Sequence, residues 1–182
     1  MSLYETDQYL KNNPGWHEED SPWKVERILE MVRKHGLSPK KVVDVGCGAG
    51  ALLSILQKSL PPETELYGYD VAPTAIAVAE KRQNEKLRFV CQDILKTEDR
   101  DADLLLLMDV FEHVPDYMGF LTSLNRYAKQ FMFHIPLDMN MLHLLQDRQI
   151  LSRDVAGHLH YYSKATGLRT LEDCGYKIVD WT

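Results

Sequence analysis

The chain has 182 residues, of which 45% are hydrophobic, and a formal net charge of −6. This length supports one domain with a sizeable core. No apolar run approaches the ~20 residues that a membrane span needs, and the N-terminus has neither the basic start nor the apolar run of a secretory signal. The three cysteines, an odd number without metal-ligand spacing, are typical of reduced thiols. We therefore expect a cytoplasmic protein with no membrane contact, and the acidic charge makes nucleic acid an unlikely partner.

The N-terminal residues 1–38 are predicted to form a helical segment ahead of a core domain at 39–182. Its helix is expected to begin with Ser21 as N-cap and Pro22 at the first helical position. Gly36 is the expected C-cap.

The most informative stretch is residues 42–50, VVDVGCGAG, where an apolar strand turns through three glycines into a helix. Glycine turns of this kind let the backbone approach a nucleotide closely. Two patterns fit. Gly46, Gly48 and Ala51 match the dinucleotide fingerprint, whereas Asp44 with the three glycines matches D-x-G-x-G-x-G.

Acidic residues also follow the next three predicted strands. The strand 65–70 ends in Asp70, whose carboxylate can accept hydrogen bonds from both ribose hydroxyls. The strand 87–92 is followed by Asp93, and the strand 103–109 leads into Asp109. Since open α/β sheets bind ligands at the carboxyl ends of their strands, we expect these side chains to meet at one site.

Strands and helices alternate along the chain, which predicts a mostly parallel sheet with right-handed crossovers. Helices are predicted at 50–59, 73–83, 116–129, 140–149 and 164–174, the last of them capped by Ser163; further strands are predicted at 41–46, 130–136 and 176–181.

Together these motifs resemble the class I S-adenosylmethionine (SAM) methyltransferases over residues 40–180, and the run DVFEHV at 109–114 resembles their small-molecule members. The resemblance implies a three-layer Rossmann-like α/β fold, here without the last antiparallel strand. It implies SAM as cofactor, S-adenosylhomocysteine as product, and residues 1–38 as a lid. The cofactor-binding residues that it implies are Asp44, Gly46, Cys47, Gly48, Gly50, Asp70, Val71, Gln92, Asp93, Ile94, Met108, Asp109, His113 and Trp16.

Methyl transfer needs alignment of nucleophile, methyl and sulfur, and a base only where the nucleophile must lose a proton. Histidine suits that task at neutral pH. The candidate catalytic residues are His113, His134 and His158, acting on a small-molecule acceptor. His160 lies on the opposite face from His158 if that segment is extended.

Three alternatives remain. Asp109, Glu112, His113 and a later His158 resemble the metal site of the Hen1-type RNA 3′-terminal ribose 2′-O-methyltransferases, although that family has Glu where this chain has Asp109. Our prediction assigns no metal ligands. A nicotinamide-binding domain is disfavoured by Asp44 and by the Gln92–Asp93 pair. A non-catalytic SAM-binding module is the third alternative.

Overall fold

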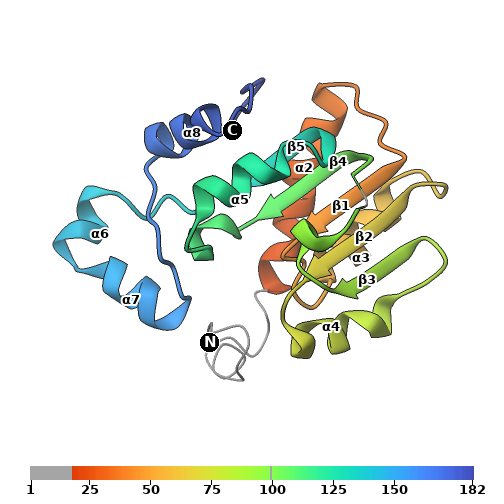
Figure 1. The fold of residues 1–182 in the computed structure, drawn as a ribbon, viewed down its shortest axis with the longest axis horizontal. Helices are drawn as coiled ribbons and strands as arrows, with labels where there is room; N and C mark the ends of the chain where they lie inside the picture. The colour runs from red at the N-terminus through yellow and green to blue at the C-terminus, as the bar shows by residue number, and fades with distance from the viewer. Residues whose placement is uncertain (1–17, 99) are drawn as a thin grey trace.

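The computed structural model describes residues 18–182 except residue 99 and shows a parallel sheet of five strands with helices on both faces (Figure 1). The strands lie in the order β3-β2-β1-β4-β5, and every pairing is parallel. They are β1 (Lys41–Val45), β2 (Glu65–Asp70), β3 (Leu87–Cys91), β4 (Ala102–Met108) and β5 (Ala128–His134). The predicted three-layer Rossmann-like architecture is confirmed.

Most of the described helices are short, and two of them continue into a 3-10 turn. They are α2 (Ser21–Lys34), α3 (Ala51–Leu56), α4 (Pro73–Ala79), α5 (Tyr117–Leu124), α6 (Met141–Leu145), α7 (Arg148–Val155) and α8 (Lys164–Asp173). The 3-10 turns are η2 (Glu18–Asp20), η3 (Gln57–Ser59), η4 (Glu80–Arg82), η5 (Ile94–Lys96) and η6 (Phe111–His113).

The two helical layers follow from the alternation of side chains along each strand. Val42 of β1 points toward α2, α3 and α4, and neighbouring Val43 points toward α5 and α8. Strands buried on both faces read as continuous apolar runs, which explains Leu104–Leu107 in β4.

Several predicted boundaries are wrong by a few residues. Asp20, not Ser21, is the N-cap of α2. The helix predicted at 116–129 ends at Leu124, because β5 already begins at Ala128. The helix predicted at 140–149 is two helices, since Asp147 adopts a left-handed φ of 50° between them.

The predicted strand at 176–181 is wrong, because these residues form no strand and pair with none of the five described strands. Side chains hold the segment instead. The Tyr176 ring packs edge-on against Phe131 and Phe133 of β5, and its hydroxyl donates to the carbonyl of Leu121. Asp180 contacts Lys34 and His35 at the end of α2. A cleft of about 1200 Å³ lies between β5, α2 and this segment.

Helix α2 packs against α3 through Val25, Ile28 and Val32, in the same core as β1. Residues 1–17, with Trp16, lie outside the described residues, so the lid and the boundary at residue 38 stay predictions. Among the residues that the structure describes, no helix has the length and apolarity needed to cross a membrane.

Candidate active site

A cleft of about 590 Å³ opens at the carboxyl ends of β1, β2 and β3. This volume is within the range of small-molecule sites. Six of the predicted cofactor residues line it: Gly46, Asp70, Val71, Gln92, Asp93 and Ile94. The opposite wall comes from the segment after β4 and from α5, between Val110 and Ser123. The predicted strand-end residues therefore meet at one cleft.

The glycine turn from β1 into α3 holds two glycines for different reasons. Gly50, the N-cap of α3, has a φ of 80°, and a Cβ there would lie 2.5 Å from Cζ of Phe89. Gly48 has a φ of 54°, but a Cβ there would meet nothing within 4 Å. Packing thus excludes a side chain at position 50, whereas position 48 faces open space in which a ligand can approach the backbone.

The Asp70 carboxylate is fixed by the backbone around it. Its Oδ2 accepts from the Gly48 amide and its Oδ1 from the Ala72 amide, both at 2.8 Å. Burial raises the pKa of Asp70, and these amide hydrogen bonds oppose the rise. A carboxylate offers about four acceptor positions, so Asp70 can accept a further hydrogen bond.

Asp93 caps the turn after β3. Its Oδ1 accepts from the Leu95 amide at 2.9 Å, which begins the 3-10 turn η5. The side chain therefore has a local structural role in addition to lining the cleft.

Two other predicted residues are buried beneath the glycine turn. Asp44 in β1 is 2% exposed, and burial is the main reason that its pKa rises to about 8. Burial also raises the pKa of the Cys47 thiol. Neither side chain lines the cleft, so any contribution to a ligand passes through the turn or through the backbone.

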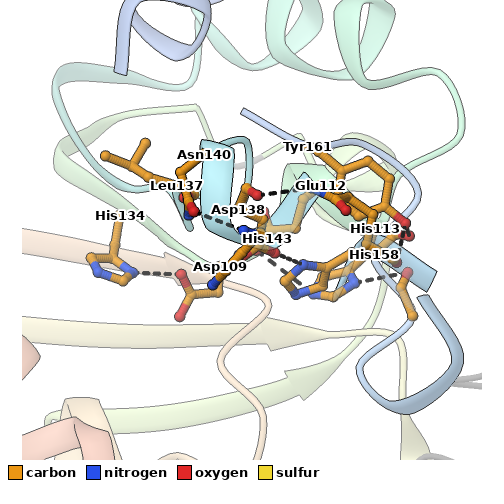
Figure 2. A network of polar contacts seen from close by, with 12 residues as sticks. Asp109, Glu112, His113, His134, Leu137, Asp138, Asn140, His143, His158 and Tyr161 are labelled. Carbon is orange, nitrogen blue, oxygen red and sulfur yellow. Dashed lines mark hydrogen bonds and ion pairs between the residues drawn. The ribbon is translucent and has the colours of Figure 1, made fainter. Parts of the chain in front are cut away.

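Asp109 follows β4 and forms ion pairs with residues from α2 and β5. Figure 2 shows its contact with His134 of β5. Lys24 Nζ donates to its Oδ2 at 2.6 Å, and His134 Nδ1 donates to its Oδ1 at 2.5 Å. Burial raises the pKa of Asp109, but the hydrogen bond and charge of His134, with Lys24, outweigh it and bring the pKa to about 2. Met108 and His134 both line the larger cleft beside β5.

The other predicted histidines gather at η6. His113 and His158 have ring centroids 4.9 Å apart, and His158 Nδ1 lies 2.7 Å from Oδ2 of Asp138. His160 faces the other way: its ring contacts Tyr117, and its Nε2 is 3.0 Å from the carbonyl oxygen of Val114. Glu112, beside them, is fully buried, and its pKa rises to about 8, mainly through burial.

The sequence analysis did not predict two parts of the site. Lys24 reaches Asp109 from a helix 85 positions earlier, and no motif connects them. The wall from α5 has no chemical signature, although its position directly after the strand-4 motif places it at the same edge of the sheet.

Comparisons with known proteins agree with this geometry. A family described as "Methyltransferase domain" matches residues 16–180. A ubiquinone biosynthesis O-methyltransferase of Glaesserella parasuis is 27% identical over an alignment that covers 72% of this chain and 68% of that protein. The enzyme of the same name from Chromobacterium violaceum is 27% identical over an alignment that covers 96% of this chain and 88% of that protein.

Solved structures share the fold. A plantazolicin methyltransferase in complex with S-adenosylhomocysteine (SAH) superposes with a TM-score of 0.71 at 20% identity, covering 93% of this chain and 70% of that one. The magnesium protoporphyrin IX methyltransferase of Synechocystis PCC 6803, also with bound SAH, gives 0.68 at 19% identity, covering 93% and 78%. The predicted family is confirmed, and the chain belongs to the class I SAM-dependent methyltransferases.

Proposed function

We propose that this chain transfers a methyl group from SAM to an oxygen atom of a small-molecule acceptor. The observation that carries the proposal is the cleft of about 590 Å³, because Gly46, Asp70 and Asp93, each from a different strand end, line it together. The relatives are named O-methyltransferases, which favours an oxygen nucleophile.

In this proposal Asp70 binds the ribose of the cofactor through the lone pairs that the Gly48 and Ala72 amides leave free. Gly48 lets the backbone approach the ligand. The sulfonium supplies an activated methyl, so the chain contributes alignment and exclusion of water.

His134 is the base that we favour among the three candidates. Asp109 accepts from its Nδ1–H, so Nε2 has the lone pair when the imidazole is neutral, and its side chain is 35% exposed at the carboxyl end of β5. His113 and His158 stay candidates, but both lie in the more enclosed cluster at η6, where they are 13% exposed.

The test is a calorimetric titration of the purified chain with SAH. We expect binding in the micromolar range, about −8 kcal/mol, and a loss of tenfold or more in Asp70→Ala, because a charge-assisted hydrogen bond contributes roughly 1.5–3 kcal/mol. Asp173→Ala is the matched control, since this aspartate pairs with Arg169 on the surface of α8. Binding that is absent, or equal in both variants, contradicts the proposal.

Turnover separates this proposal from a non-catalytic module. With a panel of small hydroxyl-bearing aromatic acceptors, we expect SAH to form with at least one of them, and His134→Gln to slow that reaction while SAH binding persists. Binding without turnover across the panel would favour a non-catalytic module.

The RNA ribose methyltransferase alternative has mixed support. Glu112, His113 and His158 lie together, as its metal site requires. Asp109, the fourth residue of that pattern, instead has each carboxylate oxygen bonded to Lys24 or His134. The four-residue pattern is thus not assembled here, and the small-molecule proposal is preferred.

A further inference from the structure

Helix α2 contacts both members of the Asp109–His134 pair near its first turn. The Trp23 ring packs edge-on against the His134 ring, with centroids 5.4 Å apart, an arrangement that aromatic rings favour. The next residue, Lys24, donates from Nζ to Oδ2 of Asp109 at 2.6 Å. Two consecutive residues of the helix therefore hold the candidate base and its carboxylate, although neither lines the cofactor cleft of about 590 Å³.

Asp109 contacts His134 through its main chain and its side chain, in an unusual backbone conformation. Its φ is 60°, in the left-handed region that non-glycine residues rarely adopt. The Asp109 amide donates to the His134 carbonyl at 3.2 Å, and its Oδ1 accepts from Nδ1 of His134 at 2.5 Å (Figure 2). Conformations of this kind persist only where the surrounding contacts fix them, and they cluster at active sites. The strained turn after β4 therefore fixes where Asp109 meets His134.

The carboxylate plane of Asp109 needs a second contact to be defined. The torsion that turns a carboxylate about its Cβ–Cγ bond is soft and allows a broad range of angles. A hydrogen bond from His134 alone thus leaves the plane poorly defined. Lys24 binds the other oxygen, and because its side chain is only 10% exposed, water competes little for the ammonium group. With both oxygens occupied, Oδ1 is directed at His134.

Among the acidic groups near Lys24, Asp109 is the one that carries a charge at neutral pH. Burial raises the pKa values of Asp44 and Glu112 to about 8, although the charge of Lys24 acts against the rise. Burial also raises the pKa of Asp109, but His134 and Lys24 outweigh it and bring this pKa to about 2. The nearly buried ammonium of Lys24 therefore has in Asp109 the anionic partner that it needs.

We propose that Lys24 is a positioning residue for methyl transfer, because it orients Asp109 and through it the His134 imidazole. This inference rests on the proposed function, in which His134 is the base. Oδ1 of Asp109 accepts from Nδ1–H, so the neutral imidazole has its lone pair at Nε2. As the acceptor oxygen bonds to the methyl carbon, the carbon–sulfur bond breaks with its electron pair going to sulfur, and Nε2 takes the hydroxyl proton. Lys24 acts only through Asp109.

The tautomer of His134 tests this role without any assay of methyl transfer. Nitrogen-15 NMR of the neutral imidazole, at mildly alkaline pH, distinguishes Nδ1–H from Nε2–H, and His134→Gln assigns the signal. We expect the Nδ1–H form in the unchanged chain and in Lys24→Arg, which keeps both the charge and the donors. Lys24→Met, which removes both, should give a mixture of the two tautomers.

Kinetics separate positioning from substrate binding. In Lys24→Met we expect kcat to fall by about tenfold to a hundredfold, the cost of a misplaced catalytic group, while KM for the acceptor and the affinity for SAH change by less than about twofold. Lys24→Arg should recover most of kcat. Lys34→Met is the matched control, since Lys34 pairs with Asp180 at the exposed end of the same helix. It should turn over like the unchanged chain.

Circular dichroism identifies a variant that fails to fold, and Lys24→Gln, which is shorter and uncharged, then replaces Lys24→Met with the same expected results. An unchanged His134 tautomer or an unchanged kcat in these variants would overturn the role of Lys24, while turnover by the unchanged chain upholds the proposed function. Absent turnover by the unchanged chain would instead contradict the proposed function, and a changed tautomer would then still show that Lys24 orients His134.

Discussion

Asp44 is a carboxyl group in the middle of the parallel sheet. It is 2% exposed, and one of its oxygens, Oδ1, has no hydrogen-bond partner among the residues that the structure describes. Burial and the charge of Asp70 raise its pKa to about 8, against the lowering effect of Lys24. The folded protein therefore keeps this carboxyl protonated at pH values where the unfolded chain has lost the proton.

Because of this raised pKa, the stability of the folded protein should fall as the pH rises. Below pH 3.8 both states hold the proton, and between pH 3.8 and about 8 only the folded state does. The unchanged chain thus loses at most about 1.4 kcal/mol of stability per pH unit over that window. Asn does not titrate, so the stability of Asp44→Asn relative to the unchanged chain should grow from pH 5 to pH 8. Urea unfolding at each pH measures it.

Asp103 provides the control of opposite sign. Its pKa is lowered to about 2, chiefly by a hydrogen bond from Lys129. Its stabilising effect is complete above pH 4 and is lost only as the pH falls toward 2. Asp103→Asn should therefore lower stability by the same amount at pH 5 and pH 8. A flat difference for Asp44→Asn as well would show that Asp44 is ionised in the folded protein.

The turn between β1 and α3 is the element that combines folding with ligand approach. A Cβ at Gly50 would overlap Phe89, and φ there is left-handed. A Cβ at Gly48 has open space around it. We expect Gly50→Ala to lose about 2–4 kcal/mol of stability from overpacking and strain, and Gly48→Ala to lose only about 1–2 kcal/mol from strain while SAH binding falls at least tenfold.

Gly36 separates the strain from the effect on binding. It has a φ of 59°, and a Cβ there would meet nothing within 4 Å, much as at Gly48, but it lies after α2 and outside the cleft. Gly36→Ala should match Gly48→Ala in stability, measured by urea unfolding, and bind SAH normally by calorimetry. Equal SAH binding by Gly36→Ala and Gly48→Ala would remove position 48 from the ligand site.

At this scale the sequence predicted the central elements well, because they are encoded locally. A strand buried on both faces is recognisable in the sequence as a continuous apolar run, as in β4. A tight turn from a strand into a helix is recognisable by its glycines. The carboxylates at Asp70 and Asp93 were predictable since each ends a strand of a parallel sheet. Lys24 was not, because its contact with Asp109 depends on how α2 packs across the sheet.

Glu112 is a second example of what local pattern leaves open. Its charge, in the run that follows a predicted strand, suggests solvent exposure, yet Glu112 is fully buried. The segment around His158 lies against η6, where the amides of Leu159 and His160 donate to the Glu112 carbonyl. The Hen1-type resemblance connects the two segments, but no periodicity in the sequence predicts that the Glu112 side chain is buried.

Across the whole molecule, the C-terminal residues show why a strand needs a partner as well as a pattern. Tyr176–Trp181 is rich in β-branched and aromatic residues, which predicts a strand. In the fold, Tyr176 and Asp180 fasten the segment to β5 and α2 by side chains, across a cleft of about 1200 Å³. Its backbone joins none of the five described strands, so side-chain contacts alone attach it to them.

Hydrogen exchange distinguishes a side-chain attachment from a hydrogen-bonded strand. We expect the amides of 177–180 to exchange as fast as those of an exposed loop, whereas those of β4, paired on both sides, exchange slowest in the chain. Asp180→Asn should increase the cleavage of this segment by a protease at neutral pH and leave the overall unfolding transition nearly unchanged, since exposed ion pairs contribute at most about 1 kcal/mol. Asp173→Asn, on the surface of α8, is the control. Exchange at 177–180 as slow as in β4 would instead mean that this segment joins the sheet in solution, because only ladder hydrogen bonds protect an exposed extended backbone to that degree.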